Sequence, residues 1–481
     1  MHNIILIITD TYRYDNLGDR AEVMPVRTPE LDAFAAQRAT EVEGFYTGSF
    51  PTIPHRTDIA TGRLGWPNYG WQPIDQSGRN HIARILNGKG YATQLICDCP
   101  HLFNSRFQPG FTAAFQTRGQ EGDKALLHLN DPIETVMPPE KTRPRPSYKG
   151  HTLVDQHRWH NRYWSFESET FPAQTGALAS RWLEENYKAG PFFLWVDFFD
   201  PHEPWDPPEY LVKRYTPDYD GIPMIHPNYG RADAYTDDEL RNLRAHYAAE
   251  AELVDRWIGR VLQKIDDLML WENTVVIVTS DHGMSVGEHS RTGKSNISDD
   301  DERYWPIYPE IGHVPFLVAA PDVPKGKSLS MLGQPMDFLP TACDLAGAEI
   351  ETPEPLHGRS FAEALRSGSG KHRDVAVSGC YVRSRQIGSV PGKATTPFLV
   401  TSQWGYAPVG ADGKPELYDL TADSLAANDI SADNEKIVKE MHDLLISHLN
   451  EYDAPDEALK CWGRNPRLNA DGTWAIDYEE A

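Results

Sequence analysis

Five short runs of apolar and β-branched residues recur along the chain, and segments with helical periodicity lie between them. Runs that are apolar at nearly every position and bounded by turn residues are typical of strands buried on both faces of a parallel sheet. The runs are NIILIIT (3–9), YATQLIC (91–97), PFFLWVDFF (191–199), NTVVIVTS (273–280) and VPFLVAA (314–320). Their alternation with helices predicts an α/β fold with a doubly wound, mainly parallel sheet.

Two of the intervening helices have clear local signals. Thr28 is expected to cap a helix that starts at Pro29, because threonine and proline are favoured at these two positions. That helix would bury Leu31, Phe34 and Ala35. A longer helix is predicted over 238–268, where apolar residues recur close to the 3.6-residue period.

After about residue 370 the pattern changes to shorter strand-like pieces, followed by an amphipathic helix near 434–449. The pieces lie at 374–382, 397–408 and 416–420. This change predicts a larger α/β domain over 1–370 and a smaller C-terminal α+β subdomain over 371–481, with an antiparallel sheet and a helix packed on it. Two other stretches, 103–170 and 298–303, are interpreted as surface insertions that act as lids or subunit contacts, so a homo-oligomer is one expected state.

Charge and cysteine content exclude several classes of protein. With 46 lysines and arginines against 70 acidic residues, the net charge of −24 excludes nucleic acid as a partner but allows a small anionic substrate in one cationic or metal-containing cleft. The five cysteines show no paired spacing, which favours reduced thiols in the cytoplasm; Cys97 and Cys99 are interpreted as buried thiols. No apolar run approaches the roughly 20 residues that span a bilayer, and the apolar start runs directly into Asp10 without a leader. We therefore expect no membrane association.

Polar side chains follow three of the predicted strands. Asp10 follows the first run, Asp200 and His202 follow the third, and Asp281 and His282 follow the fourth. Because such sheets place their chemistry beyond the carboxyl ends of the strands, we expect these side chains at one rim. Two carboxylates and an imidazole suit a divalent cation such as Mn²⁺ or Zn²⁺.

The run SFPTIPHRTDIATGR (49–63) offers a hydroxyl to the same site. Thr52 alone could be a helix cap, but Arg56 and the Thr61-Gly62 pair around it favour a chemical role. A hydroxyl is a weak nucleophile at neutral pH, and a divalent metal with a nearby guanidinium activates it. Thr52 is therefore the predicted nucleophile and a fourth metal ligand.

The sequence resembles the sulfatase branch of the alkaline phosphatase superfamily. The family pattern, C/S-x-P-x-R followed by four residues and Thr-Gly, is matched by TIPHR (52–56), TDIA and TG (61–62), with Thr52 at the nucleophile position. Other matching segments follow in the family's order: NIILIITD at the start, TPELDAFA (28–35), DPHEPW (200–205), SDHGMSVGEHSRTGK (280–294), YPEIGHVPFLV (308–318), HGRS (357–360) and ELYDL (416–420). The resemblance implies that His202 and Lys294 grip the anionic oxygens of the substrate or protonate its leaving group, and that His313 contributes to substrate binding.

Three departures from the family pattern favour phosphorus substrates. Threonine cannot become the formylglycine of sulfatases, so a covalent intermediate must be cleared by water. The usual Asp-Asp pair is Asp10-Thr11, and the resulting ligand set resembles the Mn²⁺ or Zn²⁺ sites of phosphonate monoester hydrolases and phosphodiesterases. The substrate-binding GKWH segment is replaced by CDCPHLFN (97–104), which offers His101 and Asn104 instead.

Three functions remain open at this point. The leading hypothesis is a metal-dependent hydrolase of phosphodiesters or phosphonate monoesters with a threonine nucleophile and Mn²⁺ or Zn²⁺, Ca²⁺ being the less favoured metal. The second is a sulfuric ester hydrolase that works without formylglycine. The third is a family member that has lost catalysis and serves only as a binding module. The intact set of charged residues argues against this third function.

Overall fold

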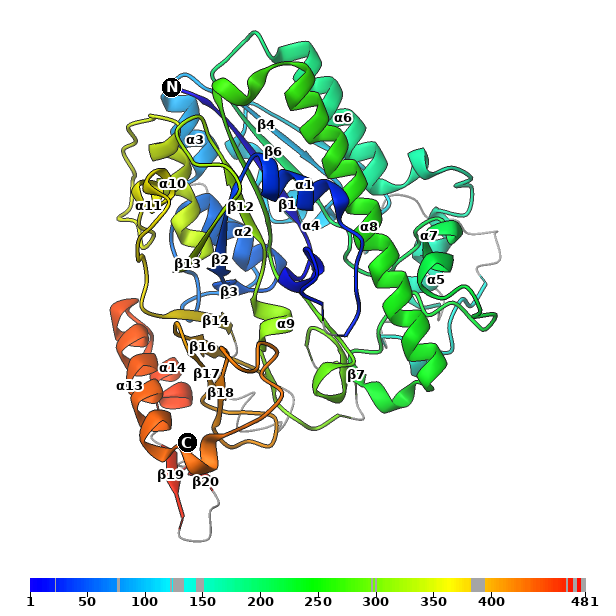
Figure 1. The fold of residues 1–481 in the computed structure, drawn as a ribbon, viewed down its shortest axis with the longest axis vertical. Coiled ribbons are helices and arrows are strands. Elements are labelled where there is room, and N and C mark those ends of the chain that lie inside the picture. Colours follow the sequence, from blue (N-terminus) through cyan, green and yellow to red (C-terminus); the bar gives the residue numbers. More distant parts are fainter. Residues whose placement is uncertain are drawn as a thin grey trace.

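The computed structural model describes residues 1–481 except 22, 76–77, 122, 124–133, 144–150, 296, 299–300, 382–393, 464–465, 470–473 and 477–481. An eight-stranded sheet forms its centre, in the order β13-β2-β12-β8-β1-β6-β4-β5 (Figure 1). The strands are β1 (Asn3–Thr9), β2 (Thr40–Phe45), β4 (Ala92–Cys97), β5 (Ala113–Gln116), β6 (Phe192–Phe198), β8 (Thr274–Ser280), β12 (Phe316–Ala319) and β13 (Lys327–Gly333).

The five predicted strands are confirmed as β1, β4, β6, β8 and β12, but one direction was wrong. β1 pairs in parallel with β6 and β8, whereas β12 is antiparallel to both of its neighbours, β2 and β8. A fully buried run looks the same in either direction, since burial on both faces fixes its composition and not its pairing.

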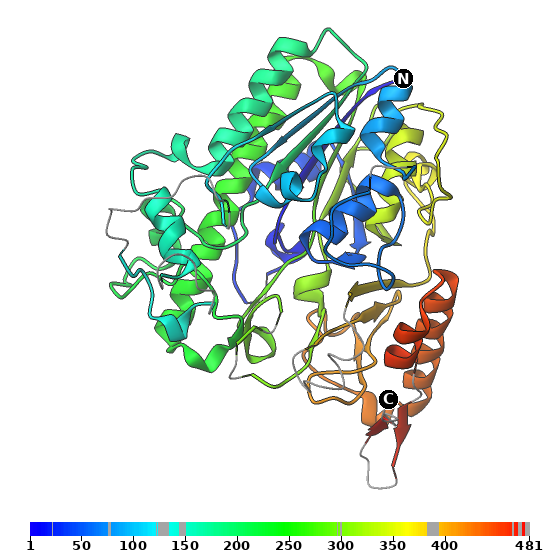
Figure 2. The ribbon, with the colours of Figure 1, turned by 180° about the vertical axis from the view of Figure 1, so that it is seen from behind.

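Helices cover both faces of the sheet, because the side chains of each strand alternate between the two faces. On β1, Ile5 and Ile7 pack in the core under α1 (Pro29–Gln37), α6 (Phe171–Asn186) and α8 (Asp237–Asp267). Ile4, Leu6 and Ile8 pack in the opposite core with α2 (Thr52–Thr61), α3 (Ile82–Gly88), α10 (Phe338–Leu345) and α11 (Ala362–Ser367). Figure 2 shows the molecule from the side of this second helical layer.

Both predicted helices are present, with a difference at the start of α1. Leu31 and Phe34 are buried as predicted, while Ala35 is partly exposed. The Thr28 hydroxyl donates to the Asn16 carbonyl and the Asp32 carboxylate instead of capping the helix. The first-turn amides of α1 are bound by the Asp255 carboxylate of α8, so a tertiary contact replaces the local cap.

A five-stranded sheet, in the order β18-β17-β16-β14-β3, lies at the opposite end of the molecule from the N-terminus (Figure 1). Its strands are β14 (Ala376–Cys380), β16 (Phe398–Val400), β17 (Trp404–Ala407), β18 (Glu416–Asp419) and β3 (Ser49–Phe50), and β14, β16, β17 and β18 are antiparallel. The predicted helix is α13 (Glu435–Glu451), which packs with α14 (Asp456–Trp462) on this sheet. Because β3 comes from the segment just before α2, the small sheet contains residues from the N-terminal part of the chain as well as from its C-terminal part. The domain boundary at 370 stays a prediction.

The interpretation of 103–170 and 298–303 as surface insertions was wrong in part. β5 is an edge strand of the main sheet, and α5 (Leu153–His160) buries Leu153, Val154 and Trp159. Asp301 is buried and pairs with Arg303. Residues 124–133, 144–150 and 299–300 lie outside the described part of the chain.

The remaining elements are short. They are α4 (Pro100–Asn104), α7 (Glu209–Tyr215), α9 (Pro309–Gly312), β7 (Gly230–Arg231), β9 (Ser285–Val286), β10 (Arg291–Gly293), β11 (Trp305–Pro306), β15 (Thr395–Thr396), β19 (Pro466–Leu468) and β20 (Trp474–Ile476). Among the described residues, no helix combines the length and the apolar character that crossing a membrane requires.

Candidate active site

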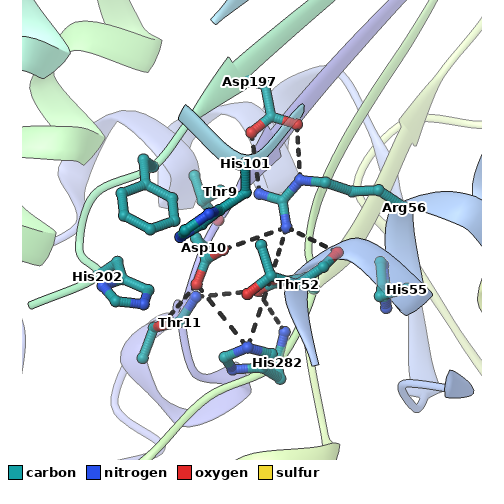
Figure 3. A network of polar contacts seen from close by, with 12 residues as sticks. Thr9, Asp10, Thr11, Thr52, His55, Arg56, His101, Asp197, His202 and His282 are labelled. Atoms are coloured by element: carbon teal, nitrogen blue, oxygen red, sulfur yellow. Dashed lines mark hydrogen bonds and ion pairs between the residues drawn. The ribbon is translucent and has the colours of Figure 1, made fainter. Parts of the chain in front are cut away.

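The carboxyl ends of β1 and β8 bring two carboxylates together. Thr9 is the register partner of Ser280, so the residues that follow, Asp10 and Asp281, leave the sheet side by side. With His282 they form a fully buried cluster in which one ligand atom from each residue lies within 4.8 Å of the others. Figure 3 labels Asp10 and His282 of this cluster. The rim predicted from the strand ends therefore exists at these two strands.

His282 is held in one orientation and one tautomer. Its Nδ1 lies 3.0 Å from the Gly283 carbonyl and donates to it, which leaves Nε2 as an acceptor. Nε2 lies 3.8 Å from an Asp10 oxygen and 3.6 Å from an Asp281 oxygen, and it is buried without a hydrogen bond. Burial, with the nearby Lys294 charge, lowers the pKa of His282 to about 3. A neutral imidazole nitrogen aimed at two carboxylates fits a divalent cation.

Arg56, from the second turn of α2, balances the charge of these carboxylates. Its Nη1 donates to Asp281 at 2.6 Å and to Asp10 at 3.2 Å. Its Nε and Nη2 each donate at 2.9 Å to the carboxylate of Asp197, which lies in β6. Neither Arg56 nor any of these three carboxylates is exposed to solvent.

The two carboxylates differ in proton affinity. Burial alone would raise the pKa of Asp10, but Arg56, His202 and Lys294 bring it well below its usual range. Burial and the negative charge of Asp10 raise the pKa of Asp281 well above its usual range. A bound cation would favour the ionised form of both groups.

Thr52 is the first residue of α2 and is 2% exposed. Its carbonyl accepts from Nη1 of Arg56 at 3.3 Å, and Phe50, just before it, packs against the ring of His282 at 4.9 Å between centroids. The Asp58 carboxylate also binds the Ser49 amide and so fixes the segment that leads into α2. Figure 3 shows Thr52 close to Asp10 and His282, and its roles as nucleophile and metal ligand stay predictions.

Lys294 lies beside Asp10, with its Nζ 3.9 Å from a carboxylate oxygen. Its Nζ donates to the Thr11 hydroxyl at 3.1 Å, and that hydroxyl donates to Asp10 at 2.8 Å. The Glu203 carboxylate lies 3.5 Å from Nζ and also accepts from the Tyr229 hydroxyl. Burial opposes ionisation of Glu203, but His202 and Lys294 lower its pKa to about 2, so it carries a negative charge.

His202 and His101 are drawn beside Asp10 in Figure 3. Nδ1 of His202 donates at 2.6 Å to the Glu203 carbonyl, and its ring stacks on Phe199 with centroids 4.1 Å apart. Nε2 of His101 lies 3.6 Å from the buried Glu121 carboxylate. Both predicted histidines are thus near the cluster, although no described contact joins either of them to it directly.

Three polar residues from the sequence analysis lie outside the cluster. Asn104 is exposed at the end of α4. His313 is stacked between Tyr14 and Tyr46, and its Nε2 binds the Glu43 carbonyl. Asp200 accepts from Gln120 at 2.6 Å, away from the rim. Their proximity in sequence to strand ends does not bring these three side chains to the metal cluster.

Sequence reasoning missed Asp197, Glu203 and Thr11. The signal for Asp197 was an ionisable residue inside an otherwise apolar strand, a position that requires a buried partner. Glu203 was named only as part of a motif beside His202. Thr11 was treated as the loss of a carboxylate, whereas it links Lys294 to Asp10 through its hydroxyl.

The sulfatase family model matches residues 2–348 of the 481 residues. The chain belongs to the sulfatase family. It is 24% identical over 461 residues to an arylsulfatase of Clostridium perfringens (strain 13 / Type A), covering 88% of each chain. The family assignment confirms the resemblance inferred from the motifs, and with it an ester hydrolase whose family binds a divalent metal.

Two solved structures share the fold. A phosphonate monoester hydrolase of Agrobacterium radiobacter superposes with a TM-score of 0.71 at 21% identity, over 99% of this chain and 100% of that one. A protein in complex with its substrate D-glucosamine-2-N,6-O-disulfate superposes with a TM-score of 0.69 at 18% identity, over 94% and 98%. These likenesses confirm the α/β architecture and leave the transferred group, phosphorus or sulfur, to chemical argument.

Proposed function

We propose that the chain hydrolyses phosphodiesters or phosphonate monoesters with Thr52 as the nucleophile and a divalent metal, Mn²⁺ or Zn²⁺, held by Asp10, Thr52, Asp281 and His282. One observation carries the proposal: a threonine stands at the head of α2 beside the buried cluster, where the family uses a residue that is converted to formylglycine. A threonine ester has no aldehyde collapse available, so it must be cleared by hydrolysis.

The metal, when bound, would supply the positive charge that lets the Thr52 hydroxyl lose its proton to solvent at neutral pH. Thr52 Oγ1 then attacks phosphorus as the bond to the leaving oxygen breaks. Arg56 Nη1 is placed by Asp197 to stabilise negative charge at this end of the site. Water then attacks the phosphorus of the threonine ester, which releases the acid product and restores the Thr52 hydroxyl.

Lys294 and His202 have different roles in this scheme. The Lys294 ammonium, held by Thr11 and Glu203, is the donor that gives a proton to the leaving oxygen. His202 donates from Nδ1 to the Glu203 carbonyl, so its Nε2 is an acceptor that can orient the attacking water or take its proton. Lys294 regains its proton from solvent after the product alcohol leaves.

The alternative is hydrolysis of sulfate esters without formylglycine. The arylsulfatase relative favours this reading. The nucleophile argues for phosphorus, because a threonine ester lacks the aldehyde collapse by which formylglycine frees sulfate and has to be cleared by attack of water, as in phosphoryl transfer.

The decisive experiment compares aryl phosphodiester, aryl phosphonate and aryl sulfate substrates that share one leaving group, on purified protein reconstituted separately with Mn²⁺, Zn²⁺ and Ca²⁺. We expect kcat/KM for a phosphorus ester to exceed that for the sulfate ester, and Mn²⁺ or Zn²⁺ to support turnover better than Ca²⁺. Faster turnover of the sulfate ester with every metal would establish the sulfatase alternative instead.

A further inference from the structure

Four aromatic rings form a continuous wall that runs from the catalytic site to the surface. Beginning at His202, the rings follow in the order Phe199, His101 and Trp71. The centroid distances are 4.1 Å from His202 to Phe199, 5.6 Å from Phe199 to His101 and 5.0 Å from His101 to Trp71. The first pair is stacked and the other two meet edge to face.

Exposure changes along this wall. Phe199 is fully buried and His202 is nearly so, whereas Trp71 is 49% exposed. Trp66, five residues earlier, is only 1% exposed and packs in the core of the small sheet. The same loop therefore buries one indole and leaves the other in contact with solvent. An exposed indole at the outer end of such a row of rings offers an apolar aromatic surface to a flat ligand.

The direction of the wall assigns it to the leaving group. In the proposed mechanism the transferred group is bonded to Thr52 Oγ1 beside Asp10. Figure 3 shows His202 on the other side of Asp10 from Thr52, and His202 lies next to Glu203, which contacts Lys294. Rings that continue outward from His202 therefore follow the substituent that departs with the leaving oxygen. The buried Glu121 carboxylate beside His101 also lies 3.8 Å from Arg143, so among the described residues this part of the wall has no unbalanced charge to attract a charged substituent.

We propose that Trp71 is a specificity-determining residue that stacks on an uncharged ring, aromatic or pyranose, in the leaving group of the ester. This inference deepens the proposed function and rests on the same site. It concerns the leaving group and is independent of whether the transferred atom is phosphorus or sulfur.

The test measures kcat and KM for esters that share one transferred group and differ only in leaving group: methyl, phenyl and glucosyl. Dividing kcat and KM of each variant by the wild-type values for the same ester removes the differences in intrinsic reactivity between the esters. We expect Trp71→Ala to raise KM for a ring-bearing ester about tenfold more than for the methyl ester, with kcat changed much less. A selective effect on phenyl or on glucosyl identifies the kind of ring.

Two further variants separate stacking from general damage. Trp71→Phe should restore most of the affinity for the ring-bearing ester, because it retains an aromatic face. Phe166→Ala removes an aromatic side chain that is 72% exposed and outside the wall, and it should leave all three esters unaffected. Equal effects of Trp71→Ala on methyl and ring-bearing esters would overturn the inference.

The proposed function and this inference fail in different ways. If the enzyme turns over sulfate esters and no phosphorus ester, the proposed function is wrong, and the same three leaving groups on sulfate still test Trp71. If phosphorus esters are hydrolysed without any preference that depends on Trp71, the function stands and the ring subsite is excluded.

Discussion

Arg56 and Asp197 form a two-point ion pair, with Nε and Nη2 of the guanidinium each 2.9 Å from a different carboxylate oxygen. Both side chains are fully buried, and they are 141 residues apart in sequence. A planar guanidinium bound in this way has a fixed orientation. The consequence is that Nη1 is directed at Asp10 and Asp281, so a residue near the carboxyl end of β6 positions the guanidinium of the active site.

Asp197→Asn should therefore impair both stability and catalysis. Removing one partner of a buried pair leaves Arg56 without its compensating charge, and we expect a loss of about 3 kcal/mol in the free energy of unfolding. Misplacement of Nη1 should also lower kcat/KM by about a hundredfold. Urea unfolding and steady-state kinetics measure the two effects, and unchanged kcat/KM in the folded variant would contradict the positioning role.

The strand ends could be predicted from the sequence, but the ion pair could not. Asp10, Asp281 and His282 directly follow apolar runs, and the topology of a parallel sheet requires such residues to meet. The pairing of Arg56 with Asp197 depends on how α2 is laid on β6, and no local pattern encodes that placement. The same limit explains why β12 was assigned the wrong direction and why the Asp255 carboxylate, from a distant helix, binds the start of α1.

Tertiary partners also decided which polar residues belong to the cluster. His313 and Asp200 carry side chains of the same kinds as the cluster and also lie near strand ends, yet their partners are aromatic rings and an amide. Because such partners come from remote segments, a histidine or aspartate in a sequence motif does not by itself show that its side chain belongs to the cluster. The three-dimensional structure was needed to separate the metal cluster from its surroundings.

Asp10→Asn and His282→Ala should each release the bound metal. Asp10→Asn removes a negative charge from the three-residue cluster, and His282→Ala removes its imidazole donor. We therefore expect metal content to fall from about one equivalent to below about a tenth of one after dialysis. Elemental analysis of the purified variants measures this directly. Full occupancy in both variants would place the metal elsewhere.

His55→Gln provides the matched control for metal content. His55 is also fully buried and also close to the start of α2, but its Nδ1 binds the Thr47 hydroxyl at 3.0 Å and it is not part of the cluster. This variant should retain its metal even if its stability falls. Loss of metal from it as well would show that the cluster is sensitive to any disturbance of α2.

Asp337 provides a pH-dependent contribution to stability that is remote from the cluster. Burial opposes its ionisation, but Arg373, which binds both carboxylate oxygens, lowers the pKa of Asp337 to about 2. The value in an unfolded chain is about 3.9. Because the folded pKa is the lower one, the contribution is fully present above about pH 5 and is lost as pH falls toward 2.

The comparison of wild type with Asp337→Asn tests this assignment. The stability advantage of the wild type, measured by urea unfolding, should shrink by about 1 kcal/mol between about pH 5 and pH 3. Asp344→Asn is the control, because Asp344 pairs with Arg366 on the surface with 45% of its side chain exposed. If the difference in unfolding free energy between the wild type and Asp337→Asn stays constant over this pH range, the contribution of Asp337 does not come from its ionisation.

Substitution of Thr52 tests the covalent mechanism. Thr52→Ala removes the proposed nucleophile and one metal ligand, and we expect turnover to fall by about a thousandfold or more, because the remaining site can only orient the substrate and stabilise charge. Thr52→Ser keeps a hydroxyl at the head of α2 and should retain measurable turnover, which separates the loss of the nucleophile from a packing defect. Rapid quenching of the serine variant and the wild type, followed by mass analysis of the peptide that carries residue 52, should detect the phosphoryl or phosphonyl ester. If Thr52→Ala stays within a few-fold of wild type, water attacks the ester directly and Thr52 is only a ligand or a helix-start residue.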